Sequence, residues 1–289
     1  MKADPRITFD YADVGDVTLH YAVAGKGERL VILLHGFPEF WYSWRHQLVD
    51  LSESYTVVAP DLRGYNLSDR PSNIPAYTLE KLTADVVGLV HHFGKENAAV
   101  IGHDWGAAIA WATAVRHPEV IWKLAALQVP PADIWKRNQT AKQFFASWYM
   151  FFFQLPLIPE WLSARNDFGL LVDSLRKSTV NKAVFTDEDI EEYKQAWAKP
   201  RALTAMINYY RANIVARLLR TGSKALPIQA PTLFVYGEKD HAVLPQTVRG
   251  VGDAVSGPFR EHRIPNSGHW VQQEARDEVT AVLRDFLNE

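Results

Sequence analysis

The sequence predicts an α/β fold in which a mostly parallel, doubly wound sheet carries an inserted helical cap. Short apolar runs typical of buried strands occupy residues 29–34 and 56–59. Helical spacing of apolar residues follows at 79–93, and another strand and helix are predicted at 98–101 and 107–116. This alternation of strands and helices is typical of a parallel sheet with helices on both faces.

The sheet pattern returns near the end of the chain. Residues 231–236 form a further apolar run with strand character, and residues 277–287 have the spacing of a helix that packs over the sheet. The middle of the chain therefore separates two parts of one core. We expect this core to comprise residues 1–130 and 227–289.

The segment between the two parts, residues 131–226, has a different composition. It lacks strand patterns, is rich in aromatic residues and begins with the second proline of a Pro-Pro pair. One of its helices is predicted to begin at Thr186, whose hydroxyl can cap the helix while Asp189 occupies the reciprocal third position. These features predict a helical cap inserted into the core.

Composition limits the classes of partner. The chain has 289 residues, of which 47% are apolar, a formal net charge of -2 and no cysteine. The weak charge favours a small neutral partner over nucleic acid or a membrane, and the lack of cysteine excludes disulfides and thiolate metal sites. The first residues lack the apolar run of a signal peptide, and no apolar run of about twenty residues is present. We therefore expect a cytoplasmic protein.

The pentapeptide Gly102-His103-Asp104-Trp105-Gly106 lies between a predicted strand and a predicted helix. Its glycines permit a sharp turn, and its spacing matches the nucleophile elbow G-x-S-x-G with Asp104 in place of serine. An aspartate at this position can also simply cap the helix that follows. The neighbouring His103 is expected to serve the scaffold, because a residue beside the motif aspartate points away from it.

A second turn, with the sequence His-Gly-Phe-Pro at residues 35–38, follows the first predicted buried strand. We expect the backbone N–H groups of Phe37 and Trp105 to face the same crevice at the strand ends. Two such donors would form an oxyanion hole. Taken alone, the glycine and proline of this segment indicate only a turn.

Two further polar residues follow predicted strands. Asp240 comes shortly after the strand at 231–236, and His269 comes after another short run with strand character. Asp104, Asp240 and His269 thus occur in the order nucleophile, acid and histidine, which predicts a catalytic triad. Asp240 would orient the imidazole of His269 and stabilise its charged form. Considered separately, Asp240 could start a turn and His269 could be a buried side chain.

An aspartate nucleophile narrows the chemistry. A carboxylate has an ordinary pKa of about 3.9, so it is ionised at neutral pH and needs no base to activate it. Its attack on a saturated carbon leaves an ester, which water can cleave, whereas a serine would leave a stable ether. His269 is then available to remove a proton from water, while the backbone donors stabilise the oxyanion formed on the Asp104 carboxyl. We expect a substrate with an electrophilic saturated carbon.

The chain resembles the epoxide hydrolase branch of the α/β-hydrolase superfamily over nearly its whole length. The resemblance is carried by residues 35–38, the segment Asp-Leu-Arg-Gly-Tyr at 61–65, the pentapeptide around Asp104, and the residues Asp240 and His269. It implies the α/β-hydrolase fold. It also implies an epoxide and water as reactants and the absence of a cofactor.

The resemblance further implies two cap tyrosines that donate hydrogen bonds to the epoxide oxygen. An alkoxide leaving group needs such an acid, whereas a halide does not. Tyr149 stands ahead of a Phe-Gln-x-Pro run and matches the first tyrosine, and Tyr210 matches the second. Tyr209 is the alternative for the second position. Plain aromatic packing is the structural alternative for both.

Haloalkane and haloacid dehalogenases share the aspartate elbow and remain the alternative function. Trp105 could help to bind a halide, but Phe37 stands where haloalkane dehalogenases usually carry an asparagine or another supporting residue. The haloacid enzymes follow their nucleophile with arginines, whereas residues 105–108 here are Trp-Gly-Ala-Ala. The predicted tyrosines therefore decide between an epoxide and a halide.

The substrate pocket is expected to be apolar, and its predicted lining residues are Phe37, Trp41, Trp105 and Phe152. No metal is expected, because the histidines and carboxylates show no His-x-x-x-His or comparable cluster. The sequence leaves both a monomer and a homodimer open.

Overall fold

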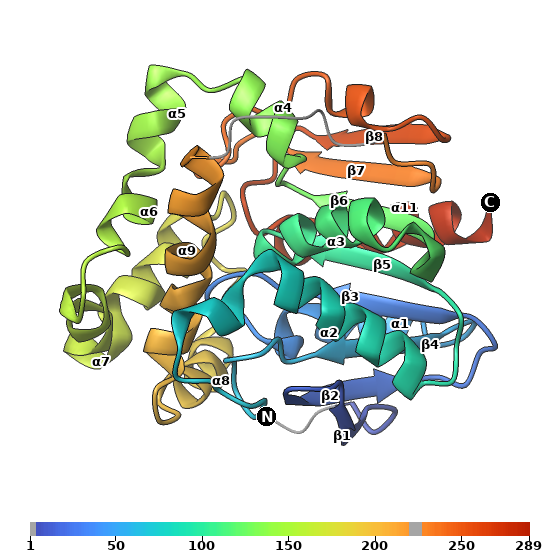
Figure 1. Ribbon diagram of the computed structural model, residues 1–289, viewed down its shortest axis with the longest axis horizontal. Coiled ribbons are helices and arrows are strands. Elements are labelled where there is room, and N and C mark those ends of the chain that lie inside the picture. Colours follow the sequence, from blue (N-terminus) through green and yellow to red (C-terminus); the bar gives the residue numbers. More distant parts are fainter. Residues whose placement is uncertain (1–3, 220–226) are drawn as a thin grey trace.

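The computed structural model describes residues 4–219 and 227–289. The chain forms one eight-stranded sheet in the order β1-β2-β4-β3-β5-β6-β7-β8, with helices on both faces and a group of helices at one end of the strands (Figure 1). The strands are β1 (Thr8–Asp13), β2 (Thr18–Ala24), β3 (Leu30–Leu34), β4 (Thr56–Pro60), β5 (Ala98–His103), β6 (Ile121–Leu127), β7 (Thr232–Gly237) and β8 (Phe259–Ile264).

The sheet is parallel from β4 through β8, and only the pairs β1–β2 and β2–β4 are antiparallel. Every residue of β3, β5 and β7 is buried, which agrees with their apolar sequences. The register pairs Leu34 of β3 with Gly102 of β5, so the segments that follow these two strands lie side by side. The predicted mostly parallel α/β sheet is confirmed.

Strands β1, β2 and β6 were not predicted, and for β1 and β6 the physical reason is clear. In the edge strand β1 only Ala12 is buried. The strand therefore has no alternation of buried apolar and exposed polar residues that would predict it from the sequence. Strand β6 contains two alanines and a lysine, which are unusual in a buried strand. Lys123 is tolerated there because its ammonium group donates hydrogen bonds to the carbonyl groups of Phe286 and Leu287 at the end of the last helix.

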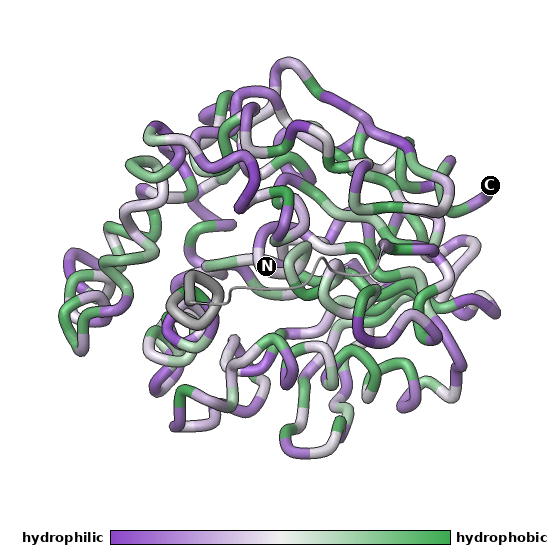
Figure 2. The backbone as a smooth tube through the Cα atoms, turned by 45° about the horizontal axis from the view of Figure 1, so that its top comes forward, coloured by the Kyte–Doolittle hydropathy of each residue, from purple (hydrophilic) through white to green (hydrophobic). Residues whose placement is uncertain are grey.

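The core helices cover both faces of the sheet. Figure 1 shows α2 and α3 in front of the sheet and α11 behind it, and in Figure 2 the hydrophobic stretches of the tube run through the interior strands. Within α2, Leu82, Val86, Leu89 and Val90 are buried, as their spacing predicted, whereas Val87 of the same pattern is half-buried. The core helices are α1 (Arg45–Asp50), α2 (Leu79–His92), α3 (Trp105–Arg116), α10 (Val271–Glu274) and α11 (Arg276–Asn288), with short 3-10 turns η1 (Trp41–Trp44), η2 (Ile74–Tyr77), η3 (Pro118–Val120) and η4 (Val251–Ala254).

The helices between β6 and β7 form the cap. They are α4 (Ala132–Arg137), α5 (Ala141–Ala146), α6 (Trp148–Phe152), α7 (Ile158–Lys177), α8 (Asp187–Trp197) and α9 (Ala202–Leu219), and they lie together on one side of the sheet (Figure 1). The predicted capping box of α8 is confirmed, with reciprocal hydrogen bonds between Thr186 and Asp189. The predicted end of the cap at residue 226 lies outside the described residues. No described helix is both long enough and apolar enough to cross a membrane.

Polar contacts join α8 to the core. The Tyr42 hydroxyl donates a hydrogen bond to Asp189 at 2.8 Å, and Arg45 forms an ion pair with the same carboxylate at 3.0 Å. At the other end of α8, the Trp197 indole N–H donates to the carbonyl oxygen of Pro38 at 2.6 Å. This last contact connects the cap directly to the turn that contains Phe37.

Candidate active site

Asp104 occupies a strained turn between β5 and α3. Its backbone has φ 51° and ψ -116°, a conformation that non-glycine residues rarely adopt. A Cβ atom at Gly102 would lie 2.1 Å from the carbonyl oxygen of Gly106, and a Cβ atom at Gly36 would lie 2.5 Å from the Cβ atom of Asp104. Only glycine therefore permits this turn and the close approach of the neighbouring loop. The geometry is that of a nucleophile elbow, and it presents the Asp104 side chain beyond the strand end.

Hydrogen bonds and a neighbouring charge favour the ionised form of Asp104. The Phe37 N–H donates to Asp104 Oδ1 at 2.9 Å, and His269 Nε2 lies 3.6 Å from Asp104 Oδ2. Burial by itself would raise the pKa of this carboxyl, but His269 and the Phe37 N–H outweigh burial and hold the pKa below its usual value. Trp105 is the first residue of α3, so its N–H has no acceptor within the helix. The positive end of the helix dipole further favours an anion here.

His269 and Asp240 come together as the triad requires. His269 Nδ1 lies 2.8 Å from Asp240 Oδ2, and both residues are buried. Asp240 Oδ1 accepts hydrogen bonds from the backbone N–H groups of Ala242 and Val243, which fix the carboxylate. Burial would lower the pKa of His269, yet the negative charges of Asp240 and Asp104 raise it well above its usual value. With Asp104 ionised, the imidazole therefore holds a second proton.

Gln128 supports Asp240, and the sequence analysis missed it. It lies directly after β6 with φ 70° and is fully buried. Its side-chain amide donates to Asp240 Oδ2 at 3.0 Å and to the carbonyl oxygen of Gly268 at 2.6 Å, while its own oxygen accepts from the Gly237 N–H at 2.7 Å. Gln128 thus connects Asp240 to the loop that carries His269. A polar residue directly after a buried strand can indicate a site residue, but this signal could not be used for Gln128 because strand β6 was not predicted.

A second buried network lies behind His269. His103 Nε2 donates to the carbonyl oxygen of His269 at 2.8 Å, and His103 Nδ1 lies 3.1 Å from the Glu39 carboxylate. The side-chain amides of Gln272 and Gln273 also donate to Glu39. Glu39 follows the turn at residues 35–38 directly, and a glutamate beside that motif was a signal the sequence analysis did not use. His103 serves the scaffold, as expected, by holding the backbone of His269.

Tyr149 of α6 and Tyr210 of α9 approach the same space from the cap. Their ring centroids are 5.9 Å apart, and the Tyr210 ring lies 5.2 Å from the ring of Trp105 and 5.4 Å from that of Phe37. Burial raises the pKa of both phenols, and the negative charge of Asp104 raises both further. Both hydroxyls therefore stay protonated, which is the state in which they can donate a proton or a hydrogen bond.

Tyr209, the alternative to Tyr210, has a different role. Its hydroxyl donates a hydrogen bond at 2.8 Å to the carbonyl oxygen of Arg63 in the core, and its side chain is fully buried. Its donor is therefore occupied. Among the two neighbouring tyrosines, Tyr210 is the one whose ring packs against Phe37 and lies near Asp104.

The predicted pocket residues divide into two groups. Phe37 and Trp105 contact the Tyr210 ring and flank Asp104. Trp41 instead has ring contacts with Phe9, Phe40 and Tyr42. Phe152 has ring contacts with Trp148 and Phe153. Among the described residues, the ring contacts of Trp41 and Phe152 include none with His269, Tyr149 or Tyr210.

Phe153, which the sequence analysis did not name, is the phenylalanine of this run whose ring contacts Phe37, Tyr149 and Tyr210. Its ring centroid lies 5.3 Å from that of Phe37, 6.0 Å from that of Tyr149 and 4.9 Å from that of Tyr210, and it is 4% exposed. The three consecutive phenylalanines at residues 151–153 have the same sequence signal. Only the orientation of the short helix that carries them determines which ring faces the core.

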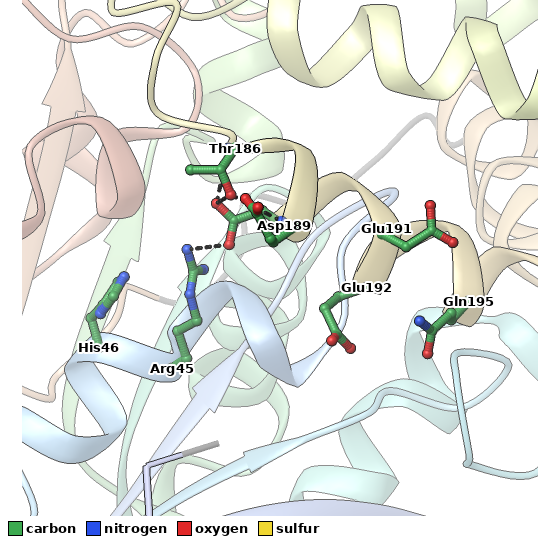
Figure 3. Close-up of a pocket in the computed structure, with 8 residues that line it drawn as sticks. Arg45, His46, Thr186, Asp189, Glu191, Glu192 and Gln195 are labelled. Carbon is green, nitrogen blue, oxygen red and sulfur yellow. Dashed lines mark hydrogen bonds and ion pairs between the residues drawn. The ribbon is translucent and has the colours of Figure 1, made fainter. Parts of the chain in front are cut away.

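A surface groove lies apart from these residues, on the seam between α1 and α8 (Figure 3). Within it Asp189 is engaged by Arg45 and Thr186. Burial, reinforced by the charge of Arg45, lowers the pKa of His46 to about 4, so this imidazole is neutral at neutral pH. The groove is lined by Arg45, His46, Thr186, Glu188, Asp189, Glu191, Glu192 and Gln195, none of which belongs to the triad or the tyrosine pair.

The described residues contain no group of three or more histidine, aspartate or glutamate side chains arranged to hold a metal ion. The charged groups around Asp104 instead pair with one another, as the His269–Asp240 contact shows. The arrangement thus joins an ionised carboxylate, a histidine with its acid and two protonated phenols.

Comparisons with known proteins identify the family of the chain. The family described as alpha/beta hydrolase fold matches residues 29–275. The AB hydrolase superfamily protein YfhM of Bacillus subtilis is 37% identical over 96% of each chain, and epoxide hydrolase 4 of Mus musculus is 37% identical over 99% of this chain and 81% of its own. The crystal structure of a Bacillus megaterium epoxide hydrolase in complex with an inhibitor superposes with a TM-score of 0.89 at 31% identity, covering 97% of this chain and all of the other.

The chain therefore belongs to the α/β-hydrolase family. Within that family its relatives include enzymes named epoxide hydrolases from animals and bacteria, such as epoxide hydrolase A of Mycobacterium tuberculosis at 35% identity. The resemblance to the epoxide hydrolase branch that the motifs indicated is confirmed, and the protein is a hydrolase of this fold.

Proposed function

We propose that this enzyme converts an epoxide to a vicinal diol through an ester formed on Asp104. The observation that carries the proposal is the convergence of two protonated cap phenols, Tyr149 and Tyr210, on an ionised aspartate at a nucleophile elbow. The names of the relatives support the same substrate class.

In the first step, a carboxylate oxygen of Asp104 attacks one ring carbon and the bond from that carbon to the epoxide oxygen breaks. The departing oxygen would carry a negative charge, so Tyr149 and Tyr210 donate hydrogen bonds and one of them transfers its proton. The product of this step is a hydroxyalkyl ester of Asp104. The apolar rings of Phe37, Trp105 and Phe153 surround the phenols and favour an apolar epoxide.

In the second step, water attacks the carbonyl carbon of this ester. Esterification removes the negative charge of Asp104, which lowers the pKa of His269. The imidazole gives up its extra proton, which replaces the proton that the tyrosine transferred, and it then acts as a base toward the attacking water. The N–H groups of Phe37 and Trp105 stabilise the oxyanion on the Asp104 carboxyl. The tetrahedral intermediate then collapses, and His269 returns the proton from water to the departing alkoxide oxygen, which completes the diol. The oxygen from water remains in the regenerated carboxylate.

The tyrosine pair favours an epoxide over an organic halide. A halide leaves as a stable anion and needs no proton, so two phenols held protonated beside the nucleophile would have no task in a dehalogenase. Incubation with styrene oxide and, separately, with 1-bromobutane tests this choice. We expect formation of phenylethanediol and no bromide release. Bromide release without diol formation would establish the dehalogenase alternative.

The covalent intermediate can be trapped in the variant His269→Gln. This variant keeps the nucleophile and the tyrosines but lacks the base, so styrene oxide should leave a lasting adduct whose mass maps to the peptide that contains Asp104. His241→Gln, which alters an exposed histidine next to Asp240, is the matched control and should turn over without accumulating the adduct. An adduct on another residue would refute the mechanism.

The remaining expectations from the sequence stay predictions. They are the absence of a cofactor, a cytoplasmic location, and the choice between a monomer and a homodimer.

A further inference from the structure

A carboxylate of the core connects the loop that carries His269 to the cap. Glu274, the last residue of α10, is half-buried, and its Oε1 atom accepts a hydrogen bond from the Gly268 N–H at 3.0 Å. Its Oε2 atom accepts hydrogen bonds from the N–H groups of Val180 and Asn181, at 2.7 and 3.4 Å. Those two residues lie between α7 and α8 of the cap. One side chain therefore bridges the histidine loop and a cap segment.

A second contact joins the same two segments on the other side of His269. The Trp270 indole N–H donates a hydrogen bond to Ser178 Oγ at 2.6 Å, and the Trp270 side chain is buried. A Cβ atom at Gly268 would lie 2.9 Å from the carbonyl oxygen of Ser178, so a larger residue there would force the cap segment away. Both sequence neighbours of His269 are thus held against the cap.

The core holds the carbonyl groups of the same loop. Gln128 donates to the carbonyl oxygen of Gly268 at 2.6 Å, and His103 Nε2 donates to that of His269 at 2.8 Å. The Gly268 N–H is instead held by Glu274, and a carboxylate acceptor makes this hydrogen bond stronger than one between neutral groups. The backbone around His269 is therefore fixed from two sides, and one of them depends on the cap.

We propose that Glu274 is a positioning residue that couples the cap to the position of the His269 imidazole. The imidazole has to keep Nδ1 next to Asp240, at 2.8 Å, while Nε2 faces Asp104 at 3.6 Å. Such an arrangement tolerates displacements of only about 0.5 Å. The cap also carries the two tyrosines, so the coupling brings the base and the acids into place together. These roles of base and acid are those of the proposed function, on which this inference rests.

The variant Glu274→Gln tests the coupling through the two steps of the reaction. An amide has one acceptor oxygen, so it can bind the Gly268 N–H or the N–H groups of the cap, but not both. The polar contacts of α8 with the core remain, so the tyrosines stay in place. We therefore expect hydrolysis of the Asp104 ester to slow about tenfold or more, while ester formation changes by less than about threefold. Rapid-quench mass spectrometry of single turnovers of styrene oxide measures both rates.

Each side of the bridge has a matched control. Glu278→Gln alters an exposed glutamate of α11 that pairs with a histidine of β8, and it should leave both rates unchanged. On the cap side, Ser178→Ala removes the acceptor of the Trp270 N–H and should slow ester hydrolysis about two- to fivefold. Ser174→Ala, one turn earlier in α7, removes a hydroxyl that donates to a carbonyl group of its own helix and should leave both rates unchanged.

Equal slowing of both steps in Glu274→Gln would mean that this residue only stabilises the fold, and it would overturn the proposal. Unchanged ester hydrolysis in this variant would overturn it as well.

Amide hydrogen exchange provides a readout that needs no turnover. In Glu274→Gln, exchange should become faster both in the peptide that contains Val180 and in the peptide that contains Gly268, and Glu278→Gln should leave both unchanged. Faster exchange in both peptides, with no diol formed by the unmodified enzyme, would refute the proposed function but support the coupling. Faster exchange in the cap peptide alone would refute the coupling.

Discussion

The core half and the cap half of the active site treat their ionisable groups in opposite ways. On the core side, a charged imidazole and a backbone N–H hold the pKa of Asp104 low despite its burial. On the cap side, Tyr149 and Tyr210 are surrounded by rings, and burial beside an anion raises the pKa of each phenol. The core environment lowers the pKa of the carboxyl group and the cap environment raises the pKa of the phenols. This difference suits Asp104 to the proposed role of nucleophile and the two tyrosines to the proposed role of acids.

The two halves are also held in place by different forces. Asp104 and Asp240 follow buried strands, and directed hydrogen bonds from the backbone and from Gln128 fix the acid. The tyrosines lie on cap helices and are positioned mainly by contacts between aromatic rings, including Phe153. We therefore expect the core half to provide the chemistry and the cap half to determine which leaving group is accepted.

The largest effect should follow removal of the nucleophile. Asp104→Ala removes the group that is proposed to form the ester, so kcat/KM for styrene oxide should fall by about 10⁴-fold or more. Steady-state assays of diol formation provide the measurement, and the urea unfolding transition checks that the variant folds. Activity within about tenfold of the unmodified enzyme would mean that another group attacks the epoxide.

Removal of both acids should have the next largest effect. The double variant Tyr149→Phe, Tyr210→Phe keeps the ring packing but cannot protonate the leaving oxygen, so the rate of ester formation should fall by about 10²- to 10⁴-fold. Rapid-quench mass spectrometry of the Asp104 peptide measures this step directly. If the ester forms at the normal rate while its hydrolysis slows, the tyrosines act in the second step instead.

The opposite pKa shifts predict how ester formation depends on pH. Asp104 is ionised because its pKa is lowered below the usual value, and the phenols are protonated because their pKa values are raised above the usual value. Ester formation needs both states, so its rate should change by less than about threefold between about pH 5 and about pH 9. Single-turnover rates across this range test the prediction. If the rate of ester formation falls about tenfold for each unit of rising pH within this range, the pKa of a required phenol lies inside the range and is not raised as expected.

The smallest effect on activity should follow a change at Tyr209. Tyr209→Phe removes the hydrogen bond to the carbonyl oxygen of Arg63, so the free energy of unfolding should decrease by about 1–3 kcal/mol while kcat/KM changes less than about threefold. Tyr210→Phe serves as the matched comparison and should show the reverse pattern. Urea denaturation and diol formation are measured for both. A greater loss of activity in Tyr209→Phe than in Tyr210→Phe would mean that Tyr209, and not Tyr210, is the acid.

Much of the core could be predicted from the sequence because its signals are local. Buried parallel strands are short apolar runs, and Asp104, Asp240 and His269 each follow such a run within a few residues. Strand β6 was missed because its alanines and Lys123 lack strand character, and Gln128 was missed with it. Its role depends on contacts with residues more than 100 positions away, which no local pattern shows.

The cap was less predictable because its helices are short and rich in aromatic residues. The start of α8 could be placed, since a capping box is a local motif. The choice between Phe152 and Phe153 could not be made, because it depends on the direction in which α6 faces the core. Tyr209 and Tyr210 are adjacent in the sequence, and contacts across the cap–core boundary distinguish them: Tyr209 donates to the Arg63 carbonyl, and the Tyr210 ring packs against Phe37.

The most direct test of the mechanism is a single turnover in water enriched in ¹⁸O, with enzyme in excess over styrene oxide. The account predicts that the first diol contains no ¹⁸O and that one labelled oxygen appears in the carboxylate of Asp104, because the oxygen added to the epoxide comes from the aspartate. Mass spectrometry of the diol and of the Asp104 peptide measures both. Label in the first diol with none in Asp104 would mean that water attacks the epoxide directly and would contradict the account.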